Sequence, residues 1–186
     1  EKHMSTISGL NIPAGLSATP AAPGEAPAPR PLRTAKPADR HGWWWGTGRR
    51  KSAVARVRLK PAKGVDAGII FEVDRDSKAA KKEGKRATKT LEQYFAEMRD
   101  RNDVTEALRS ASLIEKMHVV ISCHGGGTMG QAQACRLAIA RALVDFDPTL
   151  EARFREMSLL TRDSREVERK KYGQAGARRR FQFSKR

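Results

Sequence analysis

The sequence predicts an α+β domain with a flexible N-terminal extension before it and a long basic tail after it. In residues 52–59 apolar side chains alternate with a second set that includes two arginines, as in a strand with one buried and one basic face. Residues 117–123 form a compact run rich in β-branched residues. A long apolar helix is predicted at 130–146. At 186 residues the chain has room for one domain of ordinary size and its tails.

The charge of the chain is strongly positive. Lys and Arg number 37 against 21 Asp and Glu, which gives a formal net charge of +16 and a pI near 10.5. Such a protein repels itself unless a polyanion neutralises it, so nucleic acid is the expected partner. A membrane surface is the second candidate, but no run approaches the roughly 20 apolar residues of a spanning helix, and we expect no membrane association.

Residues 1–42 form the predicted flexible extension. They hold seven of the nine prolines, and their few large apolar residues have no period. Such a segment cannot bury enough apolar surface to offset the entropy of ordering. A cleaved organellar targeting peptide is an alternative, although the segment is richer in Pro than in Ser and Arg. Two cysteines and no export signal fit a reducing compartment.

The folded domain is expected over residues 43–158. Arg56 and Arg58 lie on the basic face of the strand at 52–59. Residues 69–73 form a second short strand, which we expect to pair with the first as a hairpin. The lysine-rich stretch 74–90 is predicted to be an inserted loop or a mobile helical arm.

Helices are expected around a buried central strand at 117–123. The helix at 130–146 is apolar round most of its circumference, which is typical of a helix packed inside a domain. Asp147 and Pro148 end it, and a last short helix starts with Thr149 or Asp147 as its cap. The expected short helices span 91–98, 104–108 and 149–154.

Residues 159–186 form the predicted basic tail. From Arg169 to the end there are eight basic residues and no acidic ones, and Gly173 and Gly176 keep the segment pliable. We expect this tail to be disordered in water and to order only along a phosphate backbone.

The glycine run Gly125-Gly126-Gly127 lies between the central strand and the long helix. Backbone N–H groups at the start of a helix favour an anion, so the run can hold a phosphate. It matches neither the dinucleotide fingerprint nor the P-loop. A tight turn that needs positive φ explains the glycines at least as well, and a phosphate of RNA would satisfy both interpretations.

Three successive tryptophans, Trp43-Trp44-Trp45, stand at the start of the domain. Beside Arg49, Arg50 and Lys51 they are able to stack on bases while the cations bind phosphates. The alternative is that one or two of them pack on the domain, and the sequence favours neither.

No catalytic or metal-binding constellation is evident. The spacing of Cys123, His124, Cys135 and His118 does not fit paired zinc ligands, so we expect no metal. The histidines form no acid–base pattern and no nucleophile motif is present. We therefore expect no cofactor and no enzyme activity.

Five distinctive stretches occur in order along the chain. They are GTGRRKSAVARV at 46–57, LEQYF at 91–95, GGG at 125–127 with GQA at 130–132 and AIARAL at 138–143, LTRD at 160–163 with VERKKYG at 167–173, and ARR at 177–179 with QFSKR at 182–186. Together they resemble bacterial small-subunit ribosomal protein nine.

This resemblance implies a mixed sheet of about four strands backed by helices, like the second domain of small-subunit ribosomal protein five. It implies residence in the head of the small subunit, bound to the 3′ major domain of the rRNA beside neighbouring head proteins. It also implies that the tail reaches the anticodon stem-loop of the tRNA in the peptidyl site. A bacterial cytoplasmic ribosome is expected in preference to an organellar one.

The charge and the resemblance together give two groups of site residues. The tRNA group is Ser184, Lys185 and Arg186. The rRNA group consists of Arg49, Arg50, Lys51, Arg56, Arg58, Gly125, Gly126, Gly127, Gln131, Arg162, Arg169, Lys170, Lys171, Tyr172, Arg178, Arg179 and Arg180.

The chain departs from the family pattern at four places: the extension, the lysine-rich insertion, the tryptophans at 43–45, where tyrosines are frequent, and Phe181, where Pro is expected. Two other functions are alternatives. A free RNA-binding module would explain the charge but not the ordered stretches. A nucleotide-dependent enzyme would need an acidic partner near the glycine run, and none has suitable spacing.

Overall fold

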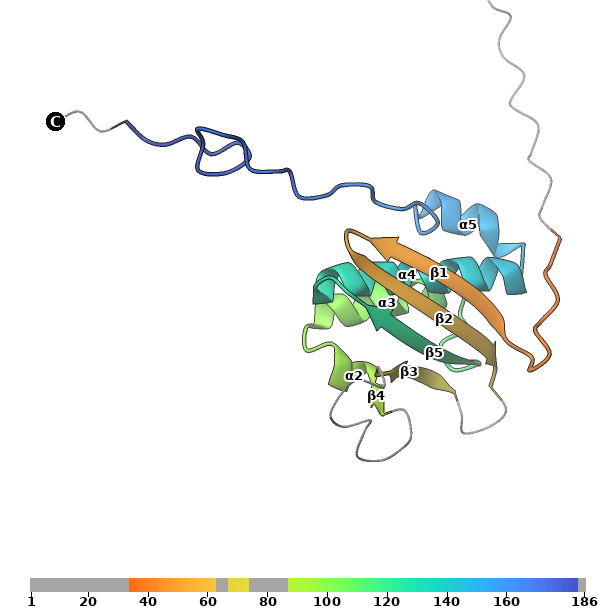
Figure 1. Cartoon of the computed structure of the whole chain (residues 1–186). Coiled ribbons are helices and arrows are strands. Elements are labelled where there is room, and N and C mark those ends of the chain that lie inside the picture. The colour runs from red at the N-terminus through yellow and green to blue at the C-terminus, as the bar shows by residue number, and fades with distance from the viewer. Residues whose placement is uncertain (1–33, 63–66, 74–86, 184–186) are drawn as a thin grey trace, which may run out of the picture. The chain divides into compact units, whose positions relative to one another are not determined.

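The computed structural model describes residues 34–62, 67–73 and 87–183. In this part of the chain five strands form one sheet in the order β1-β2-β5-β3-β4 (Figure 1). Only β3 and β5 are parallel neighbours, so the sheet is mixed as expected, with five strands where about four were implied. The strands are β1 (Trp44–Arg50), β2 (Ala53–Pro61), β3 (Gly68–Glu72), β4 (Thr88–Thr90) and β5 (Met117–His124).

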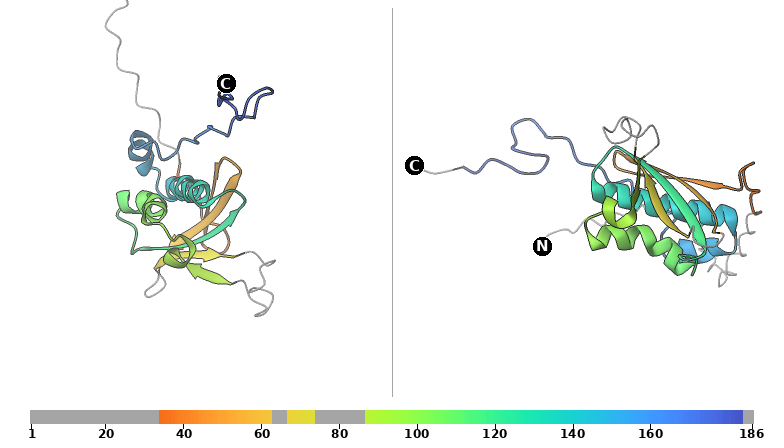
Figure 2. Two further views of the ribbon diagram at one scale, coloured as in Figure 1. Left: turned by 90° about the vertical axis from the view of Figure 1, so that its left-hand side faces the viewer. Right: turned by 90° about the horizontal axis from the view of Figure 1, so that it is seen from below.

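Helices cover one face of this sheet, and Figure 2 shows α3 and α4 on the same side of it. Among the described residues the helices are α2 (Leu91–Tyr94), α3 (Met98–Ser110), α4 (Thr128–Phe146) and α5 (Leu150–Glu156). The long helix predicted at 130–146 is therefore confirmed and starts two residues earlier. The two short helices predicted at 91–98 and 104–108 are wrong in their bounds, because α2 has a single turn and α3 is continuous.

The predicted hairpin between 52–59 and 69–73 is wrong. β5 lies between those two strands, pairing antiparallel with β2 through Val57 and Ile121 and parallel with β3 through Ile121 and Phe71. β5 carries the β-branched run, and its Val119, Val120 and Ile121 are buried, which a central position provides.

The observed hairpin joins β1 to β2 through a two-residue turn at Lys51 and Ser52. Lys51 has a φ of 50°, a positive value at a central position of the turn, as the twist-matched hairpin turns require.

Helix α4 lies unusually close to β1 because small residues meet on both sides. A Cβ on Gly46 would stand 2.1 Å from the carbonyl oxygen of Ala138, and one on Gly48 would stand 2.0 Å from that of Ala134. Glycine at these two positions therefore allows the helix backbone to contact the strand, and it fixes the helix over the edge of the sheet that carries Arg49 and Arg50.

An aromatic cluster closes the other end of the core. The ring of Phe71 stacks on Tyr94 with centroids 4.3 Å apart, and it meets Phe95 edge-on at 5.5 Å. Thr90 caps α2 in a capping box with Gln93, which holds the two aromatic residues in place.

Parts of the predicted extension, insertion and tail can also be placed. Lys36, within 1–42, donates its backbone N–H to Asp145 and its Nζ to the Asp145 carboxylate at 2.8 Å. Thr88–Thr90 form β4, so the end of the predicted insertion is strand and not loop or helix. Leu159, the first residue of the predicted tail, is buried in the core. The predictions made for 1–33, 74–86 and 184–186 lie outside the described residues.

Candidate nucleic-acid interface

The glycine run forms the turn between β5 and α4. Gly125 and Gly126 have φ values of +68° and +67°, so the interpretation as a tight turn is confirmed. Gly127 is the N-cap of α4, a helix of 19 residues, and it offers no side chain to the first N–H groups. The first turn of α4 also has no acidic residue. The positive end of the helix dipole is therefore not neutralised by the helix itself.

Side chains of α4, α2 and β2 hold this turn in place. Gln131 donates from Nε2 to the carbonyl oxygen of Gly125 at 2.9 Å, and its Oε1 accepts from the hydroxyl of Tyr94 at 2.9 Å. A Cβ on Gly126 would stand 2.8 Å from Cβ of Ala53, so the turn is also packed against the start of β2. Gln131, for which RNA binding is a prediction, thus has a structural role in this turn.

A hollow of about 200 Å³ lies between this turn and the β1–β2 hairpin. Its walls are Arg50, Lys51, Ser52 and residues 126–130. The guanidinium of Arg50 donates from Nη2 to Asp163 at 2.9 Å, while its Nε and Nη1 are buried and find no partner among the described residues. A guanidinium, a lysine and a helix N-terminus around one hollow favour an anion.

Asp163 balances part of this positive charge. Hydrogen bonds from Arg165 and, more weakly, from Arg50 hold the pKa of its carboxyl far below the ordinary range. The side chain of Arg165 donates to the same carboxylate from Nη2 at 3.0 Å, so the carboxylate ties the tail entry to the end of β1. Asp163 was not predicted as a site residue, and only its place in the matched LTRD stretch pointed to it.

The face of the sheet away from the helices carries a row of cations. Arg56, Arg58 and Lys60 alternate along β2 with the buried Val57 and Leu59. Arg49 on β1 belongs to the same face, since it pairs with Val54 and Thr47 pairs with Arg56. The predicted basic face of the strand at 52–59 is confirmed. Lys60 was missed as a site residue, although its even spacing from Arg56 was visible in the sequence.

The three tryptophans have three different environments. Trp44 packs edge-on against Phe146 at 5.0 Å and donates from Nε1 to the carbonyl oxygen of Lys36 at 2.9 Å. The ring of Trp43 lies under Arg58 and Lys60, and 52% of Trp45 is exposed. Packing is therefore established for Trp44, and stacking on a base stays a prediction for the others.

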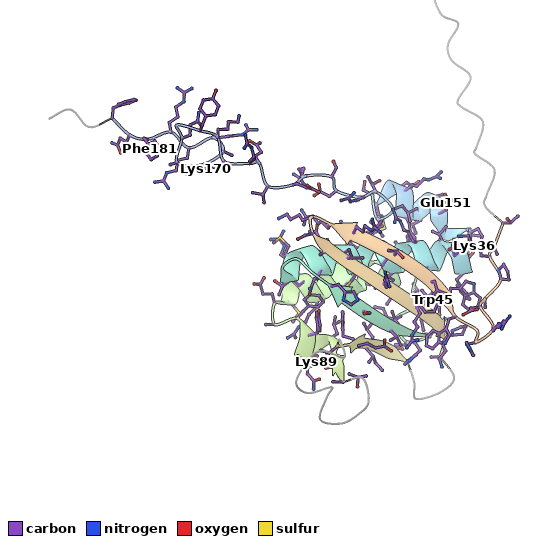
Figure 3. All side chains as sticks on the ribbon, in the orientation of Figure 1. Lys36, Trp45, Lys89, Glu151, Lys170 and Phe181 are labelled. Atoms are coloured by element: carbon purple, nitrogen blue, oxygen red, sulfur yellow. The ribbon has the colours of Figure 1, made fainter. Side chains whose placement is uncertain are left out.

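The cations of the tail between residues 168 and 181 are mostly exposed. Arg178 donates from Nε to Glu168 at 3.0 Å, and this hydrogen bond raises the pKa of the guanidinium. Backbone hydrogen bonds from Lys171 to Gly176 and from Ala175 to Arg179 close a loop between these residues. Lys170 and Phe181 project from this segment (Figure 3), and Tyr172 is 96% exposed. An exposed tyrosine among cations is suited to an external partner.

The structure thus arranges the predicted rRNA residues in three groups. Arg50, Lys51, Gly126 and Gly127 line the hollow, and Gln131 donates to the carbonyl oxygen of Gly125 in the same turn. Arg49, Arg56 and Arg58 share the open sheet face. The remaining residues form the tail group: Arg162, Arg169, Lys170, Lys171, Tyr172, Arg178, Arg179 and Arg180. Ser184, Lys185 and Arg186 lie outside the described residues.

Other kinds of site find little support in the part of the chain that the structure describes. It contains no cluster of three or more residues able to ligate a metal, and none of its helices is long and apolar enough to cross a membrane. The Sγ atoms of Cys123 and Cys135 lie 3.2 Å apart. Burial, followed by the hydrogen bond with Cys123, raises the pKa of the Cys135 thiol.

Cations on one sheet face, around a helix N-terminus and along a tail put the chain in the class of structural RNA-binding proteins. Residues 48–186 match the model of a family described as ribosomal protein S9/S16. The chain is similar to small ribosomal subunit protein uS9 of Rhodopirellula baltica, with 45% identity over 141 residues, which cover 76% of this chain and 90% of that protein. The uS9 protein of Methylacidiphilum infernorum is 44% identical over 140 residues, or 75% and 90% of the two chains.

The chain belongs to the ribosomal protein S9 family. It is therefore a structural protein of the small ribosomal subunit that takes part in translation, and not an enzyme.

Proposed function

We propose that this chain binds the rRNA of the small-subunit head, in its 3′ major domain, through the three cationic groups described above. The observation that carries the proposal is the hollow beside Arg50. There Arg50, whose Nε and Nη1 have no partner among the described residues, and Lys51 lie beside the start of α4, which has no side-chain cap. Two cations and the free N–H groups of the helix start suit a backbone phosphate, which needs donors and positive charge but no base-specific contact.

The second part of the proposal concerns the tail and tRNA. Its last three residues, Ser184, Lys185 and Arg186, match the end of the family pattern and contact the anticodon stem-loop of the peptidyl-site tRNA. Basic side chains attract phosphates without reading sequence, which suits a site that must accept every tRNA.

The neighbours in this proposal are other proteins of the small-subunit head. The matched relatives are bacterial, so the ribosome in question is that of the bacterial cytoplasm and not that of an organelle.

Sedimentation of a cell lysate through a high-salt gradient tests the rRNA part. A protein integrated in the subunit stays with it as salt rises, whereas a loosely bound polycation is stripped. Co-migration of this chain with the small subunit is expected. Migration at the top of the gradient would contradict the proposal and favour a free RNA-binding protein.

Truncation of Ser184 to Arg186 tests the tRNA part. Small subunits that carry the truncated chain should assemble normally and bind tRNA in the peptidyl site more weakly. Subunits that carry the full-length chain are the matched control. Equal tRNA affinity of the two subunits would refute the role of the tail.

A further inference from the structure

Charge is unevenly distributed between the sheet and the helices that cover it. Among the residues of the five strands, Glu72 is the only one with a carboxylate, and Arg58 occupies it in an ion pair. The helix layer mixes both signs, for example Asp103 and Glu106 with Arg99 on α3. Phosphates are therefore attracted to the open sheet face. On the helix side, carboxylates offset the positive charge.

Two tryptophans lie on this open face among the cations. Trp45 pairs across the strands with Arg58, so both project to the same side of the sheet. Trp43, two residues earlier, lies with its ring 5.1 Å from the guanidinium of Arg58 and 4.8 Å from Nζ of Lys60. It also meets the ring of His118 at 5.8 Å. Trp44 points the opposite way, into the helix layer.

The two rings differ in what they offer a ligand. Trp43 is half-buried and already engaged by two cations and an imidazole. Trp45 is 52% exposed, and it lies on the edge strand β1 (Figure 3). Trp43 therefore holds Arg58 and Lys60 in position, while the indole of Trp45 remains accessible to another flat ring.

We propose that the open sheet face binds an unpaired strand of RNA, with a base stacked on Trp45 and phosphates on Arg56 and Lys60. This inference rests on the proposed rRNA binding and names the kind of RNA involved. Cations and an exposed aromatic ring on one surface are the features that bind single strands, since the ring needs an unstacked base. A duplex keeps its bases stacked inside and would use the cations alone.

Alternation along β2 supports an extended ligand. Arg56, Arg58 and Lys60 recur at every second residue, which spaces them by about 6.8 Å along the strand. Arg58 is neutralised by its ion pair with Glu72, so Arg56 and Lys60 are the cations of β2 left to meet phosphates on either side of it.

The test compares a short single-stranded oligoadenylate with an RNA duplex, each titrated with the full-length chain in a fluorescence anisotropy experiment at several salt concentrations. The variants are Trp45→Ala, Trp45→Phe and Lys60→Ala. Met98→Ala is the matched control, because Met98 is 66% exposed but lies on α3, away from the sheet face.

Trp45→Ala should weaken binding of the single strand by roughly 5- to 150-fold, the range for loss of one base–aromatic stack. It should leave the affinity for the duplex and the slope of affinity against salt unchanged, because no phosphate contact is removed. Trp45→Phe should retain most of the affinity. Lys60→Ala should lower the salt slope by about one for both probes.

Unchanged single-strand affinity in Trp45→Ala would overturn the stacking inference, and so would an equal loss for both probes. Normal RNA affinity combined with poor incorporation into subunits would overturn it in favour of a protein contact at Trp45. None of these results would affect the proposed rRNA binding, which fails only if the chain does not sediment with the small subunit.

Discussion

The absence of a side chain at Gly46 and Gly48 sets how closely α4 can approach β1. The opposing helix face presents alanines at 134, 138 and 142, four residues apart, so both surfaces are nearly flat. A β-carbon on either glycine would enter a backbone carbonyl group rather than a flexible side chain. Neither partner can move aside without shifting the helix over the sheet.

We therefore expect Gly48→Ala to destabilise the fold by about 1–3 kcal/mol, the usual cost of overpacking a core. Urea unfolding of the full-length chain, followed by circular dichroism, measures the change. Gly176→Ala is the control, since its Cβ would meet only ordinary contact at 3.6 Å, and its effect should stay within about 0.5 kcal/mol. Equal effects of the two substitutions would show that the close approach is not needed.

Asp163 makes the stability of the chain depend on pH in the acid range. Arg165 and then Arg50 lower the pKa of its carboxyl, so near the ordinary aspartate value the folded chain binds fewer protons than the unfolded chain. The stabilisation is therefore complete above that ordinary value and is lost as the pH falls from it toward the depressed pKa.

Asp163→Asn should accordingly lower the free energy of unfolding at neutral pH, and the difference from the unsubstituted chain should shrink in acid. Urea unfolding at pH values from neutral to strongly acidic checks this. Glu166→Gln serves as the control because its contact with Arg162 is long, 3.8 Å, and both side chains are well exposed. A difference that does not change with pH would contradict the expectation.

At the scale of single residues, the sequence predicted which side chains of a strand point to solvent, but not which side chains far apart in sequence bond to each other. The alternation in β2 placed Arg56 and Arg58 on the solvent side correctly, because a strand has a fixed period of two. The bond between Arg50 and Asp163 joins residues 113 positions apart, and no local pattern encodes such a contact.

At the scale of elements, periodicity identified β5 and α4 but failed for β1. The stretch 44–50 contains two glycines and three polar residues, which are typical of a turn, and its strand character comes from pairing with β2 and packing under α4. The error in the predicted hairpin has a similar origin. Strands that follow each other in sequence often pair, which favoured pairing of β2 with β3, but the more apolar β5 lies between them.

The reactivity of the two cysteines tests how tightly α4 packs against β5. Cys123 near the end of β5 is partly exposed, whereas Cys135 in α4 is fully buried with a raised thiol pKa. A thiol reagent attacks the thiolate of an accessible cysteine, so Cys123 should react first. The remaining thiol of Cys123→Ser should react at least several-fold more slowly than that of Cys135→Ser, as measured by absorbance with an aromatic disulfide. Equal rates would mean that this packing opens readily.

At the scale of the whole molecule, the net charge is +16, and many basic residues of the described part lie on the surfaces where RNA is expected to bind. Positive residues line the sheet face, the hollow and the tail, whereas the helix layer carries compensating carboxylates. Composition alone predicted the polyanionic partner. It could not predict three separate surfaces, because their separation depends on which strand is central and where α4 begins.

These surfaces should each contribute to the salt dependence of RNA binding in proportion to the number of phosphates that they neutralise. Arg178 is bonded to Glu168, so Arg179 and Arg180 are the better candidates for binding phosphates in their part of the tail. The double variant Arg179→Gln, Arg180→Gln should reduce the slope of log affinity against log salt by about two, because each phosphate that is no longer neutralised lowers it by close to one.

Anisotropy titrations of the full-length chain with rRNA fragments of the 3′ major domain measure this slope. Arg109→Gln, on the mixed-charge surface of α3, should leave the slope unchanged. If both variants change the slope equally, RNA is attracted by net charge alone, and the tail has no place of its own on the phosphate backbone.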